Sequence, residues 1–336
     1  MTVGPLARKV LRTLPAAALW SAILAVPLVI DNAFVVGKVL VFVGINVIIV
    51  TGLALLFGYG GQVSLGHAAF YGIGAYASGF ATVKMGWPWL AGVGCAIGVS
   101  ALGGLLLSFP SLRLRGHYLA MATLGFGEIM QVVFVEAKGV TGGTDGMLGI
   151  PAPAVGRIAL GTPEASYWLV WIIAGAALLL AGNVTRSRPG RALRAMHGSE
   201  AGAQACGIDL TVLKVQVFVV SAALAGLAGS LYAHVVGFVS PTSFGLHTSV
   251  MLLAMAVLGG AGSLAGPAVA AAAFTLLPYV DALVPGLPRD VATAISEWEI
   301  DIYGLAIILV MLLAPGGAAG LLRRLRRKPR TKEGSA

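Results

Sequence analysis

The amino-acid sequence predicts an all-α fold, a polytopic helical membrane protein with about eight to ten transmembrane segments. Hydrophobic residues make up 58% of the 336 residues, only 10% are charged, and the mean hydropathy is +0.91. Soluble domains contain about 25% charged residues, and a membrane span needs about 20 mostly apolar residues. Apolar windows that fit such spans lie at about 14–30, 38–57, 64–83, 89–109, 118–136, 166–184, 215–237, 248–261, 264–280 and 302–314.

The first window follows Arg8, Lys9 and Arg12, an arrangement that resembles the start of a secretory signal peptide. No convincing small-residue cleavage site follows Ile30, where the chain continues Asp-Asn-Ala-Phe. We therefore interpret 14–30 as a retained first span, with a cleaved signal peptide as the alternative.

The basic residues predict the orientation of the spans. With a cytoplasmic N-terminus, 17 of the 22 Lys and Arg residues fall on the cytoplasmic side. This is the positive-inside pattern, and it places both termini in the cytoplasm. The net charge of +9 then reflects topology and attraction to anionic membrane lipids. Nucleic acid is not an expected partner, because the basic residues are spread over four cytoplasmic segments.

The chain is expected to form one transmembrane domain, 1–322, with a basic cytoplasmic tail at 323–336. Three long connections interrupt the spans: the external loops 137–165 and 281–301, and the cytoplasmic loop 185–214. The window 248–261 is too short to cross about 30 Å of hydrocarbon. A broken or re-entrant helix pair is therefore expected near 248–280. Ten crossings, or eight crossings plus a hairpin, both keep the C-terminus inside.

The stretch 58–79, GYGGQVSLGHAAFYGIGAYASG, contains seven glycines. Small residues at 68, 72, 75 and 79 share one helical face, and small residues allow membrane helices to approach closely. This face is expected to press against neighbouring helices. Gln62, Ser64 and His67 gather at the cytoplasmic mouth of the third span, where they either line an aqueous path or cap and bridge helices.

Glu128 lies about ten residues into the fifth window, near mid-membrane. A charged side chain there costs about 3 kcal/mol, so an intramembrane acid is a candidate for function. We expect a role in the pathway or its gate, with hydrogen bonding to the 62–67 cluster as one option. A protonated, structural Glu128 is the alternative.

No catalytic residue, metal site or cofactor site is predicted. The five His residues lack metal-ligand spacing, and no Ser-His-acid or Cys-His set shares one side of the membrane. Cys95 and Cys206 are not placed to pair. The Gly-Gly-Gln at 60–62 is similar to part of the signature motif of ABC-type ATPases, but the chain has no GxxxxGK[ST] phosphate loop. The chain is therefore not expected to be an enzyme.

Five ordered blocks resemble the permeases of branched-chain amino acid ABC transporters, the M-type subunit in particular. They are the 58–79 stretch, LRLRGHYLAMATLGFGEI at 112–129, TGGTDGMLGIP at 141–151, the block SRPGRALRAMHGSEAGAQACGIDL at 187–210, and LGGAGSLAGP at 258–267. The resemblance implies an importer in the bacterial cytoplasmic membrane. Its implied partners are a homologous H-type permease, two cytoplasmic ATP-binding subunits and an external solute-binding protein.

The resemblance also assigns roles to particular residues. The 187–210 block corresponds to the loop that couples permeases to their ATPases, with Arg191, Arg194, Glu200 and Gly207 as its marked positions. On physical grounds, this segment predicts a short amphipathic helix between Gly198 and Gly207, and an ordinary solvated loop is the alternative. The TGGTDG segment, with Thr141, Gly142, Gly143 and Asp145, is expected to face the binding protein.

Two questions of function stay open in the sequence. Relatives with the same blocks import leucine, isoleucine, valine, urea, short amides or aromatic acids, and pairing with a different permease or with a second copy is compatible with one chain. The runner-up function is a self-sufficient, ion-coupled secondary transporter with Glu128 as the proton carrier, because such folds use broken helices.

Overall fold

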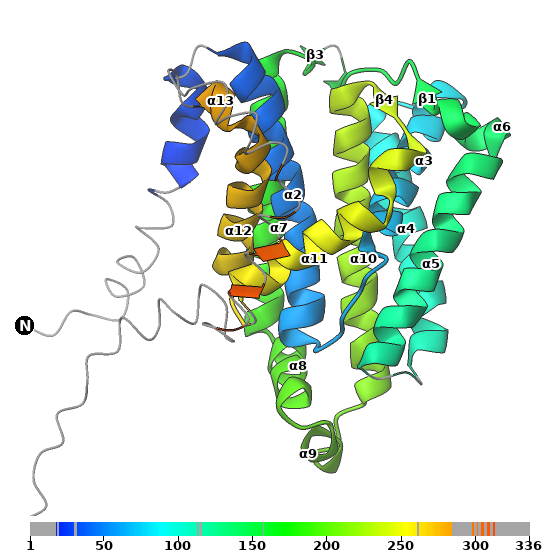
Figure 1. Ribbon diagram of the computed structural model, residues 1–336, viewed down its shortest axis with the longest axis vertical. Helices are drawn as coiled ribbons and strands as arrows, with labels where there is room; N and C mark the ends of the chain where they lie inside the picture. The colour runs from blue at the N-terminus through cyan, green and yellow to red at the C-terminus, as the bar shows by residue number, and fades with distance from the viewer. Residues whose placement is uncertain are drawn as a thin grey trace, which may run out of the picture.

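The computed structural model describes residues 18, 20–29, 32–112, 114, 116–156, 158–260 and 262–283, with seven isolated residues between 298 and 312. The predicted external loop 281–301 and the tenth window lie mostly outside these residues, and the tail 323–336 lies wholly outside them. Most of the helices run along one common direction in a bundle (Figure 1). Their bounds are α2 Leu40–Leu53, α3 His67–Val83, α4 Trp89–Ser111, α5 His117–Glu136, α6 Lys138–Thr141, α7 Pro163–Arg186, α8 Arg188–Gly198, α9 Glu200–Ala205, α10 Leu210–Val236, α11 Leu246–Gly259, α12 Ala265–Leu276 and α13 Val280–Leu283.

Six helical stretches in the described part of the chain are long and apolar enough to cross a membrane. They are Val35–Tyr59, Trp89–Pro110, His117–Glu136, Pro163–Arg186, Leu210–Val236 and Pro241–Gly259. Two shorter helical pieces, α3 and the stretch Ala265–Tyr279, lie between and beside them. The prediction of a polytopic helical membrane protein is confirmed.

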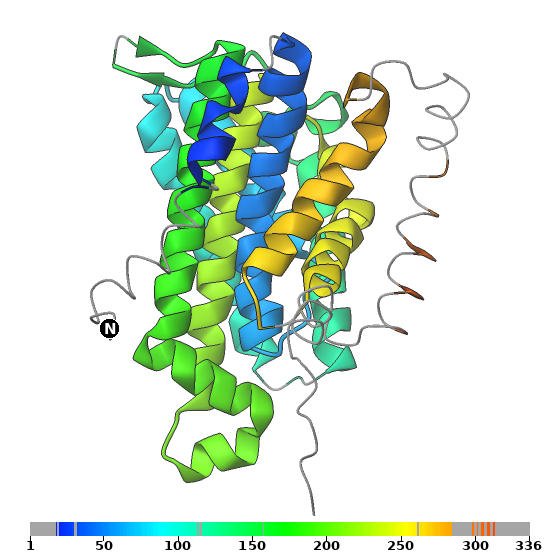
Figure 2. The same cartoon turned by 90° about the vertical axis from the view of Figure 1, so that its left-hand side faces the viewer.

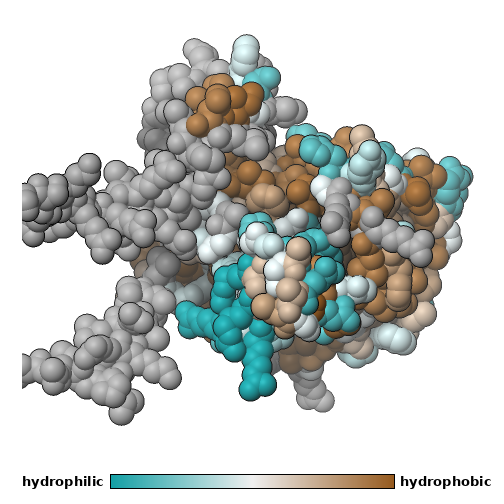
Figure 3. Space-filling model, turned by 90° about the horizontal axis from the view of Figure 1, so that it is seen from below, coloured by the Kyte–Doolittle hydropathy of each residue, from teal (hydrophilic) through white to brown (hydrophobic). Residues whose placement is uncertain are grey.

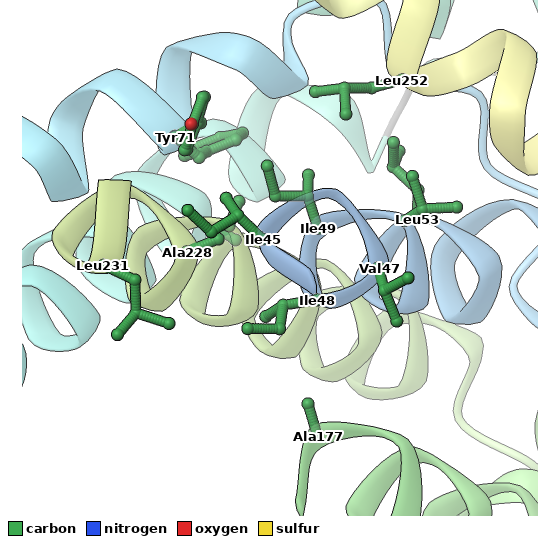
Figure 4. Close-up of a cluster of buried hydrophobic side chains, with 14 of the residues drawn as sticks. Ile45, Val47, Ile48, Ile49, Leu53, Tyr71, Ala177, Ala228, Leu231 and Leu252 are labelled. Carbon is green, nitrogen blue, oxygen red and sulfur yellow. The ribbon is translucent and has the colours of Figure 1, made fainter. Parts of the chain in front are cut away.

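Helix α2 forms the centre of the bundle. It is extended by π-helical turns at both ends, so Val35–Tyr59 is continuous. A helix that is apolar on every side is expected to be enclosed on every side, and Ile45, Ile48 and Ile49 are fully buried. Figure 4 shows side chains of neighbouring helices around this helix, among them Tyr71 of α3, Ala228 of α10 and Leu252 of α11.

The expected tight packing of the glycine-rich helix is confirmed. Gly72 and Gly79 of α3 are buried, and a Cβ atom at Gly72 would lie 2.6 Å from the Phe134 ring. On the facing helix, a Cβ at Gly229 would overlap the carbonyl oxygen of Tyr71, and Gly226 lies against Gly74. The backbones of α3 and α10 therefore touch, which is the packing that small residues provide when lipid supplies no hydrophobic drive for association.

Helices α3 and α11 are shorter than the roughly 20 residues of a typical span, although α11 reaches 19 residues together with the 3₁₀ turn that begins at Pro241. Helix α3 has 17 residues and α11 has 14, which correspond to about 25 and 21 Å at about 1.5 Å per residue. The chain at 60–66, between the end of the Val35–Tyr59 helix and α3, is non-helical and turns back into the bundle before α3 begins (Figure 1). Helix α11 runs obliquely across the bundle and packs against α12 (Figure 1). Helices α11 and α12, two short helices that pack against each other, fit the expected broken helix pair near 248–280, whereas α3 lies outside that range.

The end of the bundle opposite α8 and α9 carries the short strands. Strand β1, Met147–Leu148, pairs antiparallel with β4, Phe238–Val239, and β2, Ala154–Val155, pairs with β3, Ile158–Ala159. The described part of the loop 137–165 is therefore attached to the end of α10. This attachment uses buried His234, whose Nδ1 donates to the carbonyl of Pro151 at 2.7 Å while Nε2 accepts from Ser78 Oγ at 2.9 Å.

The described part of the first window is helical over residues 20–25 and packs on α7. The hydroxyl of Tyr167 donates to the carbonyl of Ile23 at 2.6 Å, and the Trp20 ring meets the Trp171 ring edge-on at 6.0 Å. This segment is therefore part of the packed bundle.

Candidate translocation site and cytoplasmic hairpin

The three polar residues predicted at the mouth of the third span lie inside the protein. Gln62 and Ser64 belong to the non-helical segment 61–66, and His67 is the first residue of α3. Ser64 and His67 have no exposed surface, and Gln62 is 7% exposed. Gly61, with a φ of 64°, turns the chain back toward the interior at the start of this segment. The cluster is therefore deeper than a surface position at the mouth of the span.

Hydroxyl groups from three other helices meet this segment. The backbone N–H of Leu65 donates to Thr123 Oγ1 of α5 at 3.0 Å, and that of Ala68 donates to Ser249 Oγ of α11 at 3.1 Å. His67 Nε2 lies 3.1 Å from Ser221 Oγ of α10. The bridging interpretation of His67 is thereby supported. Helices α3, α5, α10 and α11 are joined at this one point.

Sequence reasoning missed the three hydroxyl residues, Thr123, Ser221 and Ser249. The only signal that could have indicated them is a small hydroxyl in an apolar helix, which membrane helices also use for internal bonds. Two buried polar atoms at this point, Ser64 Oγ and His67 Nδ1, have no hydrogen-bond partner among the described residues. Such atoms are costly in a dry interior, so a rearrangement or a water that reaches them would stabilise another state.

Glu128 does not join the 62–67 cluster, contrary to one of the expectations for it. It lies on an exposed side of α5, and no hydrogen bond or ion pair to its side chain is found in the described part of the chain. Thr123, five residues earlier on the same helix, makes the bond to the cluster instead. Met121 and Val132 share the exposed side with Glu128. The carboxylate is therefore directed away from the core of this chain.

The loop 185–214, which the sequence predicts to be cytoplasmic, forms a helical hairpin that projects beyond the bundle (Figures 1 and 2). It contains two helices, α8 and α9, where the sequence analysis expected one. The Ser187 side chain accepts from the Gly190 N–H at 3.4 Å and begins α8, and the Ser199 side chain accepts from the Gly202 N–H at 3.1 Å and begins α9. Gly207, with a φ of 76°, follows the end of α9 as expected.

Arg191 and Arg194 both support the hairpin from within. Arg194 Nη1 donates to the carbonyl of Thr185 at 2.7 Å, and Arg191 Nη1 donates to that of Arg186 at 3.2 Å. Arginine has five N–H donors, so each guanidinium keeps others for a partner. Both side chains are exposed. Viewed from the end that carries α8 and α9, the surface shows a patch of hydrophilic residues (Figure 3).

Glu200 connects the hairpin to the helix that follows it. Its Oε1 lies 2.6 Å from Lys214 Nζ of α10. The two side chains line a small cavity of about 50 Å³ together with Gln62. Close by, a Cβ at Gly61 would lie 2.9 Å from His197 Nδ1 of α8. The hairpin is therefore in direct contact with the segment that carries Gln62 and Ser64.

The TGGTDG segment forms a tight turn at the opposite end of the bundle. Thr141 is buried, and its hydroxyl donates to the carbonyl of Ala137 at 2.9 Å. Gly142 and Gly143 have φ values of 80° and 69°, which residues other than glycine rarely adopt. Asp145 is exposed at the tip of this turn. The first three residues thus build the turn, and Asp145 is presented on its surface.

The comparisons with known proteins agree with this arrangement. A family model described as "Branched-chain amino acid transport system / permease component" matches residues 35–314. The chain belongs to this family. It is therefore a multi-pass membrane permease component and not an enzyme, and a self-sufficient ion-coupled carrier is not favoured.

Curated relatives cover most of the chain. The high-affinity branched-chain amino acid transport system permease protein LivM of Salmonella typhimurium is 32% identical over 87% of this chain and 71% of its own length. The corresponding LivH protein of Escherichia coli K12 is 26% identical over 81% of this chain and 90% of its own. Similarity to both LivM and LivH indicates a system with two permeases. No solved structure matches the chain.

Proposed function

We propose that this chain is the M-type permease subunit of an ABC importer that carries branched-chain or related hydrophobic amino acids across the bacterial cytoplasmic membrane. The observation that carries this proposal is the LivM similarity over 87% of the chain. The hairpin of α8 and α9 supports it, because a permease driven by separate ATPases needs a cytoplasmic element to which they can bind. The partners are an H-type permease, two ATP-binding subunits and an external solute-binding protein.

The contacts of the hairpin suggest how motion reaches the membrane. ATP binding would draw the ATPase subunits together and shift α8 and α9. The Glu200–Lys214 ion pair and the contact of His197 with Gly61 would pass this shift to the 61–66 segment. The segment ends at the point where Thr123, Ser221 and Ser249 join four helices. Coupling of this kind requires a packed element with two discrete arrangements, and the non-helical segment is our candidate.

Glu128 is proposed to face the second permease and the pathway between the two subunits. An ionised carboxylate in contact with lipid near mid-membrane costs about 3 kcal/mol. Its exposed side of α5 therefore needs a polar or protein cover. From this position we propose a role for Glu128 in the gate at the surface of α5, separate from the buried Gln62, Ser64 and His67, which remain candidates for the pathway within this chain. At the external end, the turn at 141–146 is proposed to receive the binding protein through Asp145.

Co-purification tests the predicted partners. A tagged chain is isolated from its native host in mild detergent, and the proteins that accompany it are identified by mass spectrometry. We expect one further permease and two ATP-binding proteins in stoichiometric amounts. A second copy of this chain in place of the other permease would contradict the heterodimer, and isolation of the chain alone would contradict the importer.

A further inference from the structure

A cavity of about 300 Å³ lies between α2, α10, α11 and α12. It is at the lower end of the range of about 300–1,000 Å³ that small-molecule sites occupy. Phe42 and Asn46 reach it from α2, one helical turn apart. They are the only residues between Val41 and Leu56 that are not buried, so this side of the central helix is left uncovered toward the cavity.

The position of the cavity favours entry from the external side. Phe42 and Asn46 lie in the first half of α2, and Tyr232 is four residues from the end of α10, where the chain enters β4. This is the end of the bundle opposite the α8–α9 hairpin (Figure 1). Met251 and Met255 reach the cavity from α11, the oblique half-helix. The cavity is thus an open pocket near the end of the bundle that is predicted to be external, and α11 forms part of its wall.

Asn46 offers the cavity a fixed hydrogen-bond acceptor. The hydroxyl of Thr275 donates to the carbonyl of Ala271 at 2.7 Å, so it accepts from Asn46 Nδ2, which lies 2.8 Å away. This pair of bonds orients the Asn46 amide, so that its Oδ1 lies on the side of the amide away from Thr275. Oδ1 has no hydrogen-bond partner among the described residues, and an ammonium group is a suitable donor for it.

The remaining lining is aromatic and aliphatic. The rings of Phe42 and Tyr232 are 6.0 Å apart, and aromatic faces also attract an ammonium group. Met251 and Met255 are flexible apolar side chains that adapt to branched aliphatic shapes. No Lys, Arg, Asp or Glu is among the described residues that line the cavity. A ligand with net charge would therefore be left without a counter-ion, whereas a zwitterion carries its own.

We propose that this cavity is a transient site for a net-neutral amino acid with an aliphatic side chain, which it receives on the way from the external side to the pathway. The proposal rests on the proposed function and deepens it. In this account the binding protein selects the solute and the cavity holds it briefly, with Asn46 near the ammonium group and the two methionines around the side chain.

The test uses the complete importer with its binding protein in proteoliposomes, with labelled leucine as the probe. Asn46→Leu removes the acceptor at similar volume, Asn46→Gln keeps an amide, and Met251→Trp fills the cavity. Val269→Trp, on the exposed side of α12, is the matched control. Two quantities are measured for each variant. The first is leucine uptake at a saturating concentration of leucine-loaded binding protein, and the second is the stimulation of ATPase activity by that protein.

We expect Asn46→Leu to lower uptake about tenfold, the size expected for losing one hydrogen bond to a charged group, and Asn46→Gln to retain more activity. Met251→Trp is expected to lower uptake at least as much. ATPase stimulation should stay within about twofold of the wild type, because these substitutions leave the contact between the hairpin and the ATPases unchanged. Val269→Trp should leave both quantities unchanged.

Unchanged uptake in Asn46→Leu and Met251→Trp would overturn the site. So would a parallel loss of uptake and ATPase stimulation in these variants, because that result would assign the residues to coupling or folding. A wild-type complex that does not transport leucine would contradict the proposed function before any variant is compared. The two failures are therefore distinguishable.

Discussion

Replacing residues 187–207 with a Gly/Ser linker of equal length is expected to reduce uptake to background, a loss of at least about 100-fold. The replacement removes α8 and α9, the only described helices that project beyond the bundle. It also removes the Glu200–Lys214 ion pair and the contact of His197 with Gly61. A flexible linker has no amphipathic face to seat in a groove and no stiffness to transmit a displacement.

The measurement is ATP-dependent uptake together with the composition of the purified complex. The second permease is the internal control: it should still co-purify, because its expected contacts lie in the membrane, while the ATPases are lost. The point variants Glu200→Ala and Lys214→Ala refine the result. Each should lower uptake by a few fold, and the double variant should be no worse than either, because the pair acts as one unit. Uptake that persists after the linker replacement would contradict the coupling assignment.

Gly229→Ala is expected to destabilise the protein by about 2–3 kcal/mol, the cost of overpacking a close helix contact. The added methyl group would overlap the carbonyl oxygen of Tyr71 and approach the backbone nitrogen of Ala75 to 2.7 Å. Both atoms belong to the backbone of α3, so α3 and α10 must separate to admit it. The yield of folded protein and the midpoint of thermal unfolding in detergent should both fall.

Gly98→Ala on α4 is the matched control. Gly98 is exposed and has no atom within 4 Å of the added Cβ position. The same substitution there should be neutral, or should stabilise the helix by up to about 1 kcal/mol through helix propensity. Equal effects at the two positions would contradict the close packing of α3 on α10.

The parts of the fold that sequence reasoning predicted depend on composition and local spacing. Apolar windows predicted the spans, and the positions 68, 72, 75 and 79 predicted the packed face of α3. The helix α8 was missed although Ser187 and Pro189 are a recognisable helix start. The strands at 147–159 and 238–239 were missed because two-residue pairings have no periodicity to detect.

The candidate site was less predictable, because its members come from separate helices. Ser249 and Thr123 bond to the 65–68 backbone only through the rotation of α11 and α5, which an apolar sequence does not specify. The cavity could not be predicted either, because two of its lining residues, Asn46 and Thr275, are 229 residues apart in the sequence and meet only in the folded bundle. Glu128 was expected to face inward, yet a single chain does not reveal which of its surfaces a second subunit covers.

The central claim is that this chain transports amino acids only as part of an ATP-driven complex. Leucine uptake into proteoliposomes is the most direct measurement, with the chain alone, the two permeases, and the full complex with ATP and the loaded binding protein. We predict uptake only by the full complex, only with ATP, and competed by isoleucine and valine. Uptake by the chain alone that follows a proton gradient and is abolished by Glu128→Gln would contradict the account.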